Sequence, residues 1–253
     1  MKFSIITAVF NGARDIAGTL DSVAEQDHES IEHVIVDGAS SDETLQIVRS
    51  HDARVARVIS EPDVGVYDAF NKGLRLVTGD AIGFLNCGDR YSSSKALSKI
   101  NAEFINPNVE AVFGDLEIVD PIDHRRIIRH YSSRYFAPNR TAYGLMPAHP
   151  TLFLRRSVYR QVGEYDPRFK IAGDFELCLR VFTRRSTNYR YLPEVLVNMP
   201  SGGLSNRGWR SIWDITREMK LACSVNGVDT SYLKLCMRLP LKILEMMWGR
   251  QAG

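Results

Sequence analysis

The sequence predicts an α/β fold whose mainly parallel sheet is flanked by helices. Over the first hundred or so residues, short apolar segments alternate with helical patterns. This alternation indicates right-handed βαβ crossovers, which place successive strands parallel in one sheet. After about residue 108 the rhythm becomes irregular, yet no internal repeat or low-complexity linker interrupts it. We therefore expect one continuous domain, with a core that 253 residues can bury.

The elements of the first half are expected from hydrophobic periodicity and from turn residues. Strands are expected at residues 3–9, 33–36, 57–60 and 81–85, and helices at 16–24 and 67–77. Between the second and third strands, Ser40 and Glu43 have the spacing of a capping box, which predicts that a helix begins there.

The second half carries shorter and less regular elements. Strands are expected at 112–113, 126–130, 151–154 and 189–197, and a helix at 175–182. The stretch 132–143 is polar and rich in turn residues. From residue 209 onward the sequence is helical and increasingly apolar, and Pro240 interrupts any single long helix. The sequence therefore ends in a predicted helical tail.

The tail has two interpretations. Its apolar residues are interleaved with Lys234, Arg238, Lys242 and Arg250. It either covers the core as a terminal helix or lies as an amphipathic element on an anionic membrane face. No segment approaches the ~20 uninterrupted apolar residues of a membrane-spanning helix, and the short apolar run at the N-terminus is interpreted as the first strand. We expect a cytoplasmic protein, peripheral on the inner face of the cell membrane if the second interpretation of the tail holds.

Charge and cysteine usage exclude several classes of protein. The net charge of +2 is too small to indicate a nucleic-acid partner, because nucleic-acid binders concentrate positive charge on one face or segment. The four cysteines form no CxxC pair, so neither a zinc knuckle nor a disulfide framework is expected. This pattern favours a reducing compartment.

Polar and acidic residues follow the first four expected strands. They are Thr7 and Asn11, Asp37, residues 61–63, and residues 86–89. Each alone is explained by turn chemistry, since Asp and Asn are favoured in turns. In an open α/β sheet, however, ligands bind outside the carboxyl ends of the strands. The succession therefore predicts one edge with acceptors for a base and ribose and a carboxylate for a divalent metal.

The sequence lacks the glycine-rich phosphate loops of the common nucleotide-binding folds. The turn after the first strand reads VFNGA, without G-x-G-x-x-G, and no Walker loop is present. A diphosphate would then have to be neutralised by a metal and by basic side chains.

Four segments together resemble the successive motifs of the family 2 glycosyltransferases, which have the GT-A fold. They read SIITAVFNGARDIAGTLDSV, VIVDGASSDET, SEPDVGVYDAFNKGLRLVTGDAIGFLNCGD and GDFELCLR. The likeness covers residues 3 to about 205 and is nearest to enzymes of bacterial exopolysaccharide assembly, including the colanic-acid type. It implies an inverting transfer of a sugar from a nucleotide sugar, most simply a UDP-sugar, to a hydroxyl of a glycan or lipid-linked acceptor in cell-surface polysaccharide synthesis.

The same resemblance divides the chain and assigns roles to its residues. It implies a nucleotide-binding half at 1–107 and an acceptor half at 108–205, followed by the tail at 206–253. Asp174 matches the catalytic base, and Asp89 is the retained ligand of a Mn²⁺ or Mg²⁺ ion. Donor-binding roles fall on Thr7, Asn11, Asp37, Asp63, Lys72 and Asn86, and roles near the acceptor or the diphosphate fall on Asp115, His149, Arg180 and Ser205.

The chemistry of sugar transfer suits two carboxylates far apart in the chain. Displacing a nucleoside diphosphate builds negative charge on the leaving phosphate, which a hard cation held at Asp89 offsets. The acceptor hydroxyl must lose its proton, which a positioned carboxylate such as Asp174 can take. One direct displacement from the opposite face inverts the anomeric configuration.

Alternatives remain at both carboxylates and for the function. Asp174 also suits the N-cap of a helix, and Glu176 is a rival base. The loop Asn86-Cys87-Gly88 carries fewer acids than a full metal motif, which favours a non-catalytic glycosyltransferase-like scaffold. A sugar nucleotidyltransferase is the second alternative, although it would require a glycine- and arginine-rich phosphate loop after the first strand.

Overall fold

The structure, a computed structural model, describes residues 1–51, 55–202 and 209–240 and contains one nine-stranded sheet. Seen from one edge to the other, the strands are β3 (Val55–Ser60), β2 (Ile31–Asp37), β1 (Phe3–Val9), β4 (Ala81–Phe84), β8 (Phe153–Arg155), β6 (Ala111–Val119), β9 (Tyr189–Pro200) and β5 (Arg90–Tyr91), with β7 (Ile127–Tyr131) paired to β6. The helices are α1 (Ile16–Ala24), α2 (Thr44–Ser50), α3 (Val66–Leu76), α4 (Ala96–Phe104), α5 (Arg156–Val162), α6 (Gly173–Cys178), α7 (Trp209–Val225) and α8 (Tyr232–Cys236).

The two halves of the sheet differ in strand direction. β3, β2, β1 and β4 all pair in parallel, as the alternation of strands and helices predicts. Beyond β4 the sheet is mixed: β8 is antiparallel to both β4 and β6, while β6 and β9 are parallel. The parallel pairing that the sequence predicts is complete in the first half, whereas the second half adds antiparallel pairs, which need no crossover helix and leave no regular alternation in the sequence.

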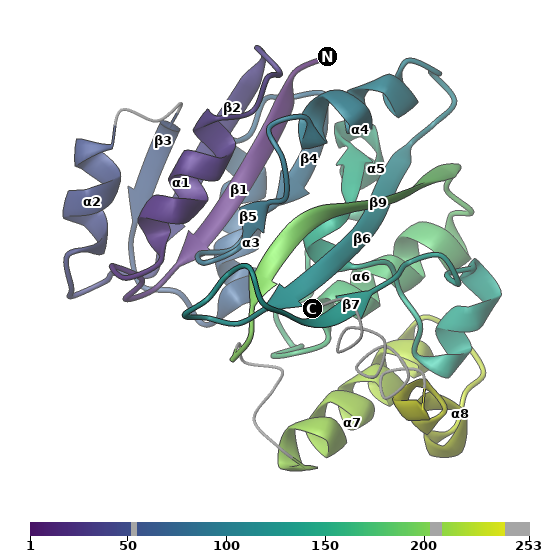
Figure 1. The fold of residues 1–253 in the computed structure, drawn as a ribbon. Coiled ribbons are helices and arrows are strands. Elements are labelled where there is room, and N and C mark those ends of the chain that lie inside the picture. The colour runs from purple at the N-terminus through teal and green to yellow at the C-terminus, as the bar shows by residue number, and fades with distance from the viewer. Residues whose placement is uncertain (52–54, 203–208, 241–253) are drawn as a thin grey trace.

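Helices cover both faces of the sheet (Figure 1). Because side chains alternate along β1, Ile6 packs with Phe70 of α3 on one face, while Phe3 and Ile5 pack with Leu97 of α4 on the other. α6 and α7 also belong to the α3 face, and α1 covers the opposite face near the edge. The parallel half is therefore a sandwich of three layers, with its carboxyl edge left open between them.

The observed elements of the first half match their expected ranges to within two residues, with one local correction. The capping box at Ser40 and Glu43 does not form: the Ser40 hydroxyl instead accepts a hydrogen bond from the Asn11 N–H at 2.7 Å. Asp42 replaces it, since its Oδ1 accepts from the Thr44 N–H at 3.0 Å where α2 begins. Ser40 thus ties the turn after β1 to the turn after β2.

Three elements of the structure were not expected from the sequence, and one expected helix has different bounds and a different geometry. α4, α5 and the two-residue strand β5 were not expected. The helix expected at 175–182 is α6 followed by a wider π-helical turn, η3 (Leu179–Arg184). Two 3₁₀ helices, η1 (Pro138–Tyr143) and η2 (His149–Thr151), lie within the irregular stretch.

The described part of the tail packs on the core. Met219, Ala222 and Cys223 of α7 and Leu235 of α8 are buried in the same cluster as α3 and α6. Within residues 1–51, 55–202 and 209–240, no helix is long and apolar enough to cross a membrane. The most apolar part of the expected tail, 241–253, lies outside the described residues.

Candidate active site

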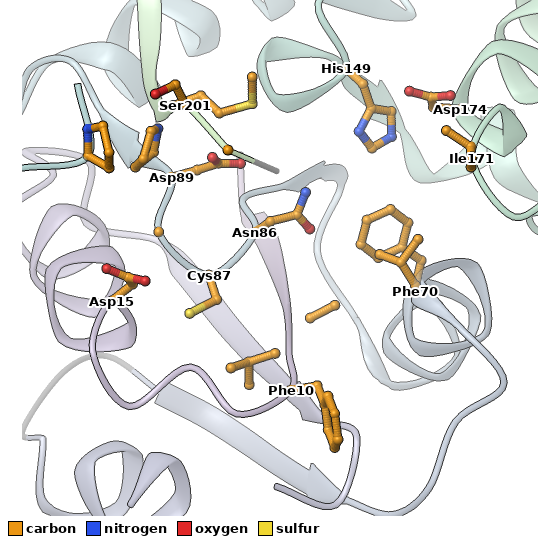
Figure 2. Close-up of a pocket in the computed structure, with 18 of the residues that line it drawn as sticks. Phe10, Asp15, Phe70, Asn86, Cys87, Asp89, His149, Ile171, Asp174 and Ser201 are labelled. Carbon is orange, nitrogen blue, oxygen red and sulfur yellow. The ribbon is translucent and has the colours of Figure 1, made fainter. Parts of the chain in front are cut away.

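A cavity of about 580 Å³ opens at the carboxyl edge of β1 and β4. The turn after β1, the loop 86–89, α3, the loop 170–174 and the end of β9 contribute to its walls. Figure 2 shows Asp89 and Asp174 on opposite sides, with Asn86 between them. Of the residues that the sequence singles out, Asn86, Asp89, His149 and Asp174 line this cavity. The fold therefore brings together a loop from each half of the chain.

Asp174 lies in the first turn of α6, with its carboxylate fixed by two donors. Its Oδ1 accepts a hydrogen bond from the Phe175 N–H at 2.7 Å, and it shares the proton of the Tyr67 hydroxyl, at 3.3 Å, with the Ile171 carbonyl, which lies at 2.7 Å. Burial raises the pKa of Asp174 to about 6, against the lowering effect of these donors. Gly173 lets the Tyr67 ring approach, because a Cβ at residue 173 would lie 2.7 Å from it. The result is a half-buried carboxylate that gives up its proton near neutral pH.

Glu176 and Arg180, by contrast, form an internal pair away from the cavity. The Arg180 guanidinium contacts the Glu176 carboxylate at 2.7 Å and donates to the carbonyls of Val162 and Glu164. Asn226 of the α7–α8 connection donates to Glu176 as well. The expected role of Arg180 at the acceptor or diphosphate is therefore wrong, because its donors are used to join α6 to the end of α5. Glu176 is likewise unsuited to act as the base.

The loop 86–89 presents oxygens that have no partner in the described chain. Asn86 Oδ1 and Asp89 Oδ2 are buried and accept no hydrogen bond from the described residues. Thr19 of α1 anchors the loop, since its hydroxyl accepts from the Gly88 N–H and donates to the Asp89 carbonyl, both at 2.9 Å. Burial raises the pKa of Asp89 to about 7. Buried polar atoms are normally paired, so these oxygens point to a missing ligand.

A divalent cation fits these oxygens, although the chain would supply few ligands to it. Oxygen donors such as Asp89 and Asn86 suit Mg²⁺ or Mn²⁺, and Mg²⁺ sites often use one or two carboxylates completed by substrate phosphates. Among the residues that the structure describes, no group of three or more His, Cys, Asp or Glu side chains could hold a metal ion. Cys87 adds no thiolate, because burial raises the pKa of its thiol to about 12.

Several predicted donor-binding residues do not line the cavity. Thr7 is fully buried, and its hydroxyl donates to the Leu85 carbonyl at 2.6 Å and contacts the buried His33 ring at 2.9 Å. Lys72 donates to the Pro62 carbonyl at 2.7 Å and pairs with Glu61 at 3.1 Å. The expected direct contact of Thr7 with the donor is therefore corrected, since its fully buried hydroxyl is committed to the sheet. Lys72 does not line the cavity, and its contact with the donor stays a prediction.

The remaining donor candidates do not line the cavity either. Asp37 is buried and accepts from the Ser40 N–H and the Ser60 hydroxyl, while its Oδ1 has no partner in the described chain. Asp63 accepts from the Gly65 N–H, and Asn11 accepts from the Ser41 N–H. Their donor-binding roles stay predictions.

Two of the residues expected near the acceptor have structural partners, and a third lies outside the described residues. Asp115 is buried and accepts from the Ser133 N–H at 2.7 Å and the Tyr191 hydroxyl at 3.0 Å, so the expected acceptor contact is corrected to a link between β6, β9 and the segment after β7. His149 does line the cavity, and its Nε2 contacts the Tyr165 hydroxyl at 2.7 Å. Burial lowers the pKa of His149 to about 4, so the ring is neutral. Ser205 lies outside the described residues.

Sequence reasoning missed several side chains of the cavity wall. Phe10 lies at its rim with 65% of its surface exposed, an unusual state for an aromatic residue that follows a buried strand. Arg14 and Lys170 are the arginine and lysine side chains of the wall, and neither has an ion pair within the described chain. Tyr67, which holds Asp174, is far from it in sequence. An aromatic residue and an arginine directly after the first strand, Phe10 and Arg14, were visible in the sequence. No sequence pattern indicated the contact between Tyr67 and Asp174.

Comparison with known proteins agrees with this geometry. Residues 4–163 match the family described as "Glycosyl transferase family 2". The chain is 31% identical over 213 residues to the "PGL/p-HBAD biosynthesis glycosyltransferase" of Mycobacterium bovis (strain BCG / Pasteur 1173P2), covering 81% of this chain and 79% of that protein. It is also 31% identical over 180 residues to an uncharacterized glycosyltransferase of Mycobacterium tuberculosis (strain ATCC 25618 / H37Rv), covering 70% and 67%.

Solved structures share the fold at low sequence identity. The mannosyltransferase PcManGT from Pyrobaculum calidifontis, in complex with GDP-Man and Mn²⁺, superposes with a TM-score of 0.67 at 18% identity and covers 99% of this chain and 74% of that one. S. aureus TarS 1–349, in complex with UDP-GlcNAc, gives 0.66 at 19% identity, covering 94% and 72%. The chain therefore belongs to glycosyl transferase family 2 and is a glycosyltransferase with the GT-A fold.

Proposed function

We propose that this glycosyltransferase inverts the anomeric configuration as it moves one sugar from a nucleotide-sugar donor to a hydroxyl of a glycan or lipid-linked acceptor. One observation carries the proposal. One cavity has a carboxylate of raised pKa, Asp174, on one side and, on the other, oxygens of Asn86 and Asp89 that have no partner among the described residues (Figure 2). Such a pair of sites matches the two charges that the reaction creates.

On one side, Asp174 acts as the general base. The acceptor hydroxyl loses its proton to the carboxylate while its oxygen forms a bond to the anomeric carbon. The bond from that carbon to the diphosphate oxygen breaks on the opposite face, so the configuration inverts. A pKa of about 6 keeps Asp174 ionised at neutral pH and still basic enough to accept a proton.

On the other side, the wall binds the nucleotide diphosphate. The exposed Phe10 ring offers a stacking surface for the base, and Arg14 offers positive charge to the phosphates. Asp89 and Asn86 would hold a Mn²⁺ or Mg²⁺ ion, which supplies further positive charge to the leaving diphosphate. The resemblance favours UDP as the nucleotide, and TarS 1–349 has been solved with UDP-GlcNAc.

The acceptor and the cellular setting follow from the resemblance and from the described tail. We place the enzyme in cell-surface polysaccharide synthesis, on the inner face of the cell membrane. Trp213 and Tyr232 stack at 5.3 Å on the outer side of α7 and α8, where Leu221 and Leu233 are also exposed. Basic residues of the same two helices, Arg217, Lys220 and Lys234, suit an anionic lipid surface. Co-sedimentation with vesicles that contain anionic lipid tests this contact; equal binding to neutral vesicles would contradict it.

The proposed reaction is tested directly with the purified full-length chain. We would supply UDP-, GDP- and dTDP-sugars with Mn²⁺ or Mg²⁺ and a lipid-linked acceptor extract, and measure nucleoside diphosphate release and sugar transfer. Transfer with inverted configuration supports the proposal. Pyrophosphate exchange without transfer would indicate the nucleotidyltransferase, and donor binding with neither activity would indicate the non-catalytic scaffold.

A further inference from the structure

One carboxylate of α7 accepts hydrogen bonds from three consecutive backbone amides of the cavity wall. Glu218 accepts from the N–H groups of Lys170 at 3.1 Å and of Ile171 and Ala172 at 2.9 Å. These residues stand immediately before Asp174, in the loop that leads into α6. We propose that Glu218 is a positioning residue, which fixes the loop 170–172 so that α6 begins where Asp174 faces the acceptor. The inference rests on the proposed role of Asp174 as the base.

The sequence of the loop explains why an outside acceptor is needed. The residue at the N-cap of α6 is Ala172, whose side chain has no oxygen with which to cap a helix. The N–H groups of Lys170, Ile171 and Ala172 come before the first hydrogen-bonded turn of α6, so they need partners from elsewhere. Glu218 supplies a charged acceptor, and hydrogen bonds to charged groups are stronger than neutral ones.

The loop is held from its opposite side as well. The Ile171 carbonyl accepts a hydrogen bond from the Tyr67 hydroxyl at 2.7 Å, and the same hydroxyl contacts Asp174 Oδ1 at 3.3 Å. α7 thus holds the N–H groups of the loop, while α3 holds its carbonyl and the base together. Lys170 and Ile171 also line the cavity, so any shift of the loop changes the wall beside the base.

Charge reinforces the geometry. Burial is the main cause of the raised pKa of Asp174, and the negative charge of Glu218 raises it further. The titratable groups near Asp174 are Tyr67 of α3, Tyr165 of the preceding loop, Cys178 of α6 and Glu218 of α7, with Lys170 and the neutral His149 in the cavity wall. Among these, Glu218 is the charged group that contacts the loop without contacting the base.

The inference makes α7 part of the active site. Figure 1 shows α7 alongside α6, at the end of the molecule away from the parallel half of the sheet. Both Asp174 and Glu218 lie beyond the residues that match the family, 4–163. The segment expected as a tail therefore supplies a contact on which the orientation of the base depends.

The test compares Glu218→Gln with Asp214→Asn in the full-length enzyme. Asp214 stands one turn earlier on α7 and, with Glu218 and Lys170, lines a second, outer cavity, yet its carboxylate makes no hydrogen bond or ion pair within the described chain. Glu218→Gln keeps the shape but loses the charge and one acceptor oxygen. We expect kcat to fall by ~10- to 100-fold, since misplacement of a catalytic group by ~1 Å can cost ~100-fold. Binding of the nucleotide sugar is retained, and the acid limb of the rate profile moves to lower pH.

Two further measurements make the outcome decisive. Hydrogen exchange of the amides at 170–172 should quicken in Glu218→Gln and stay unchanged in Asp214→Asn, whether or not a suitable acceptor has been found. Unchanged exchange and an unchanged kcat in Glu218→Gln would overturn the inference. The variant Asp174→Asn tests the proposed function separately. Full sugar transfer by Asp174→Asn would contradict the assignment of Asp174 as the base. Loss of transfer by Asp174→Asn, with unchanged kcat and unchanged exchange in Glu218→Gln, would contradict only the positioning role of Glu218.

Discussion

The two sides of the cavity each present a carboxylate, buried at Asp89 and half-buried at Asp174, and they differ in what holds it. Burial raises the pKa of both groups, to about 7 for Asp89 and about 6 for Asp174. Asp89 Oδ2 has no partner among the described residues, whereas Asp174 Oδ1 accepts hydrogen bonds from Tyr67 and Phe175. Burial alone therefore assigns no role. Asp89 Oδ2, without a partner among the described residues, is available to bind a cation, whereas the Asp174 carboxylate is oriented and can accept a proton along a defined direction.

The supports of the two carboxylates also differ in their distance along the chain. The loop of Asp89 is anchored by Thr19, within the parallel half of the sheet. Asp174 depends on Tyr67 of α3 and on Glu218 of α7, one from each side in sequence. The donor side is thus a property of one half of the chain, while the base side exists only when three distant elements are packed together.

The comparison predicts that Asp174→Asn has the largest effect. Removing a general base lowers the rate by ~10²–10⁴-fold, and the amide keeps the size of the side chain. Sugar transfer should therefore be lost while binding of the nucleotide sugar, measured by calorimetry with Mn²⁺, is retained. A variant that loses donor binding to the same extent would place Asp174 on the donor side instead.

Substitutions on the donor side should have smaller effects, and they should either raise or lower the Mn²⁺ concentration that the enzyme needs. Asp89→Asn removes the one carboxylate of the loop, so we expect weaker donor binding and a higher Mn²⁺ concentration for half-maximal rate. Asn86→Asp adds a carboxylate, so the required Mn²⁺ concentration should fall. Initial rates measured across a series of Mn²⁺ concentrations check both. If the two variants respond alike, the loop does not hold the cation.

Tyr67→Phe tests the orientation of the base through its pH dependence. Asp174 acts when ionised, so the rate of the unmodified enzyme should fall below about pH 6. The Tyr67 hydroxyl donates to the carboxylate and lowers the pKa of Asp174, so its loss should move the acid limb to higher pH. The loss of a hydrogen bond worth ~1 kcal/mol corresponds to a displacement of under ~1 pH unit. Profiles of kcat against pH measure it, and a move to lower pH would contradict the assignment.

Local patterns predicted the parallel half of the fold well. β1 and α1 have the expected bounds because an apolar run and a 3.6-residue periodicity are each properties of neighbouring residues. The mixed half is less regular because the pairing of β6 with β8, β9 and β7 joins segments far apart in the chain. The missed helix α5 has seven residues, and tertiary packing decides such short elements more than propensity does. α4 has nine residues, as α1 does, and its buried Leu97, Ile100 and Phe104 have helical spacing, so its pattern was available in the sequence.

For the site, too, the sequence predicted local features better than contacts between distant residues. The resemblance places Asp89 and Asp174 in roles that need one cavity, and the structure brings them to one cavity. A motif does not say which way its members point: the Thr7 hydroxyl is directed into the sheet, and Asp115 joins strands. The pairing of Glu176 with Arg180 was predictable from their spacing of four residues on a helix. The contacts of Tyr67 and Glu218 had no such local signal.

Substitution of Lys72 should have the smallest effect. It tests whether a residue that belongs to a family motif also contacts the donor. Its ammonium group donates to the Pro62 carbonyl and pairs with Glu61, so it ties α3 to the turn after β3 without reaching the cavity. Lys72→Met should leave the KM for the nucleotide sugar unchanged and lower the free energy of unfolding by no more than ~1 kcal/mol, as for other pairs with an exposed partner. Arg14→Met is the matched comparison, because Arg14 does line the cavity and lacks an ion pair within the described chain. The KM for the donor should rise in Arg14→Met alone. An equal rise in Lys72→Met would show that the ammonium group leaves Glu61 for the phosphates when the donor binds, and would restore the role that the motif implies.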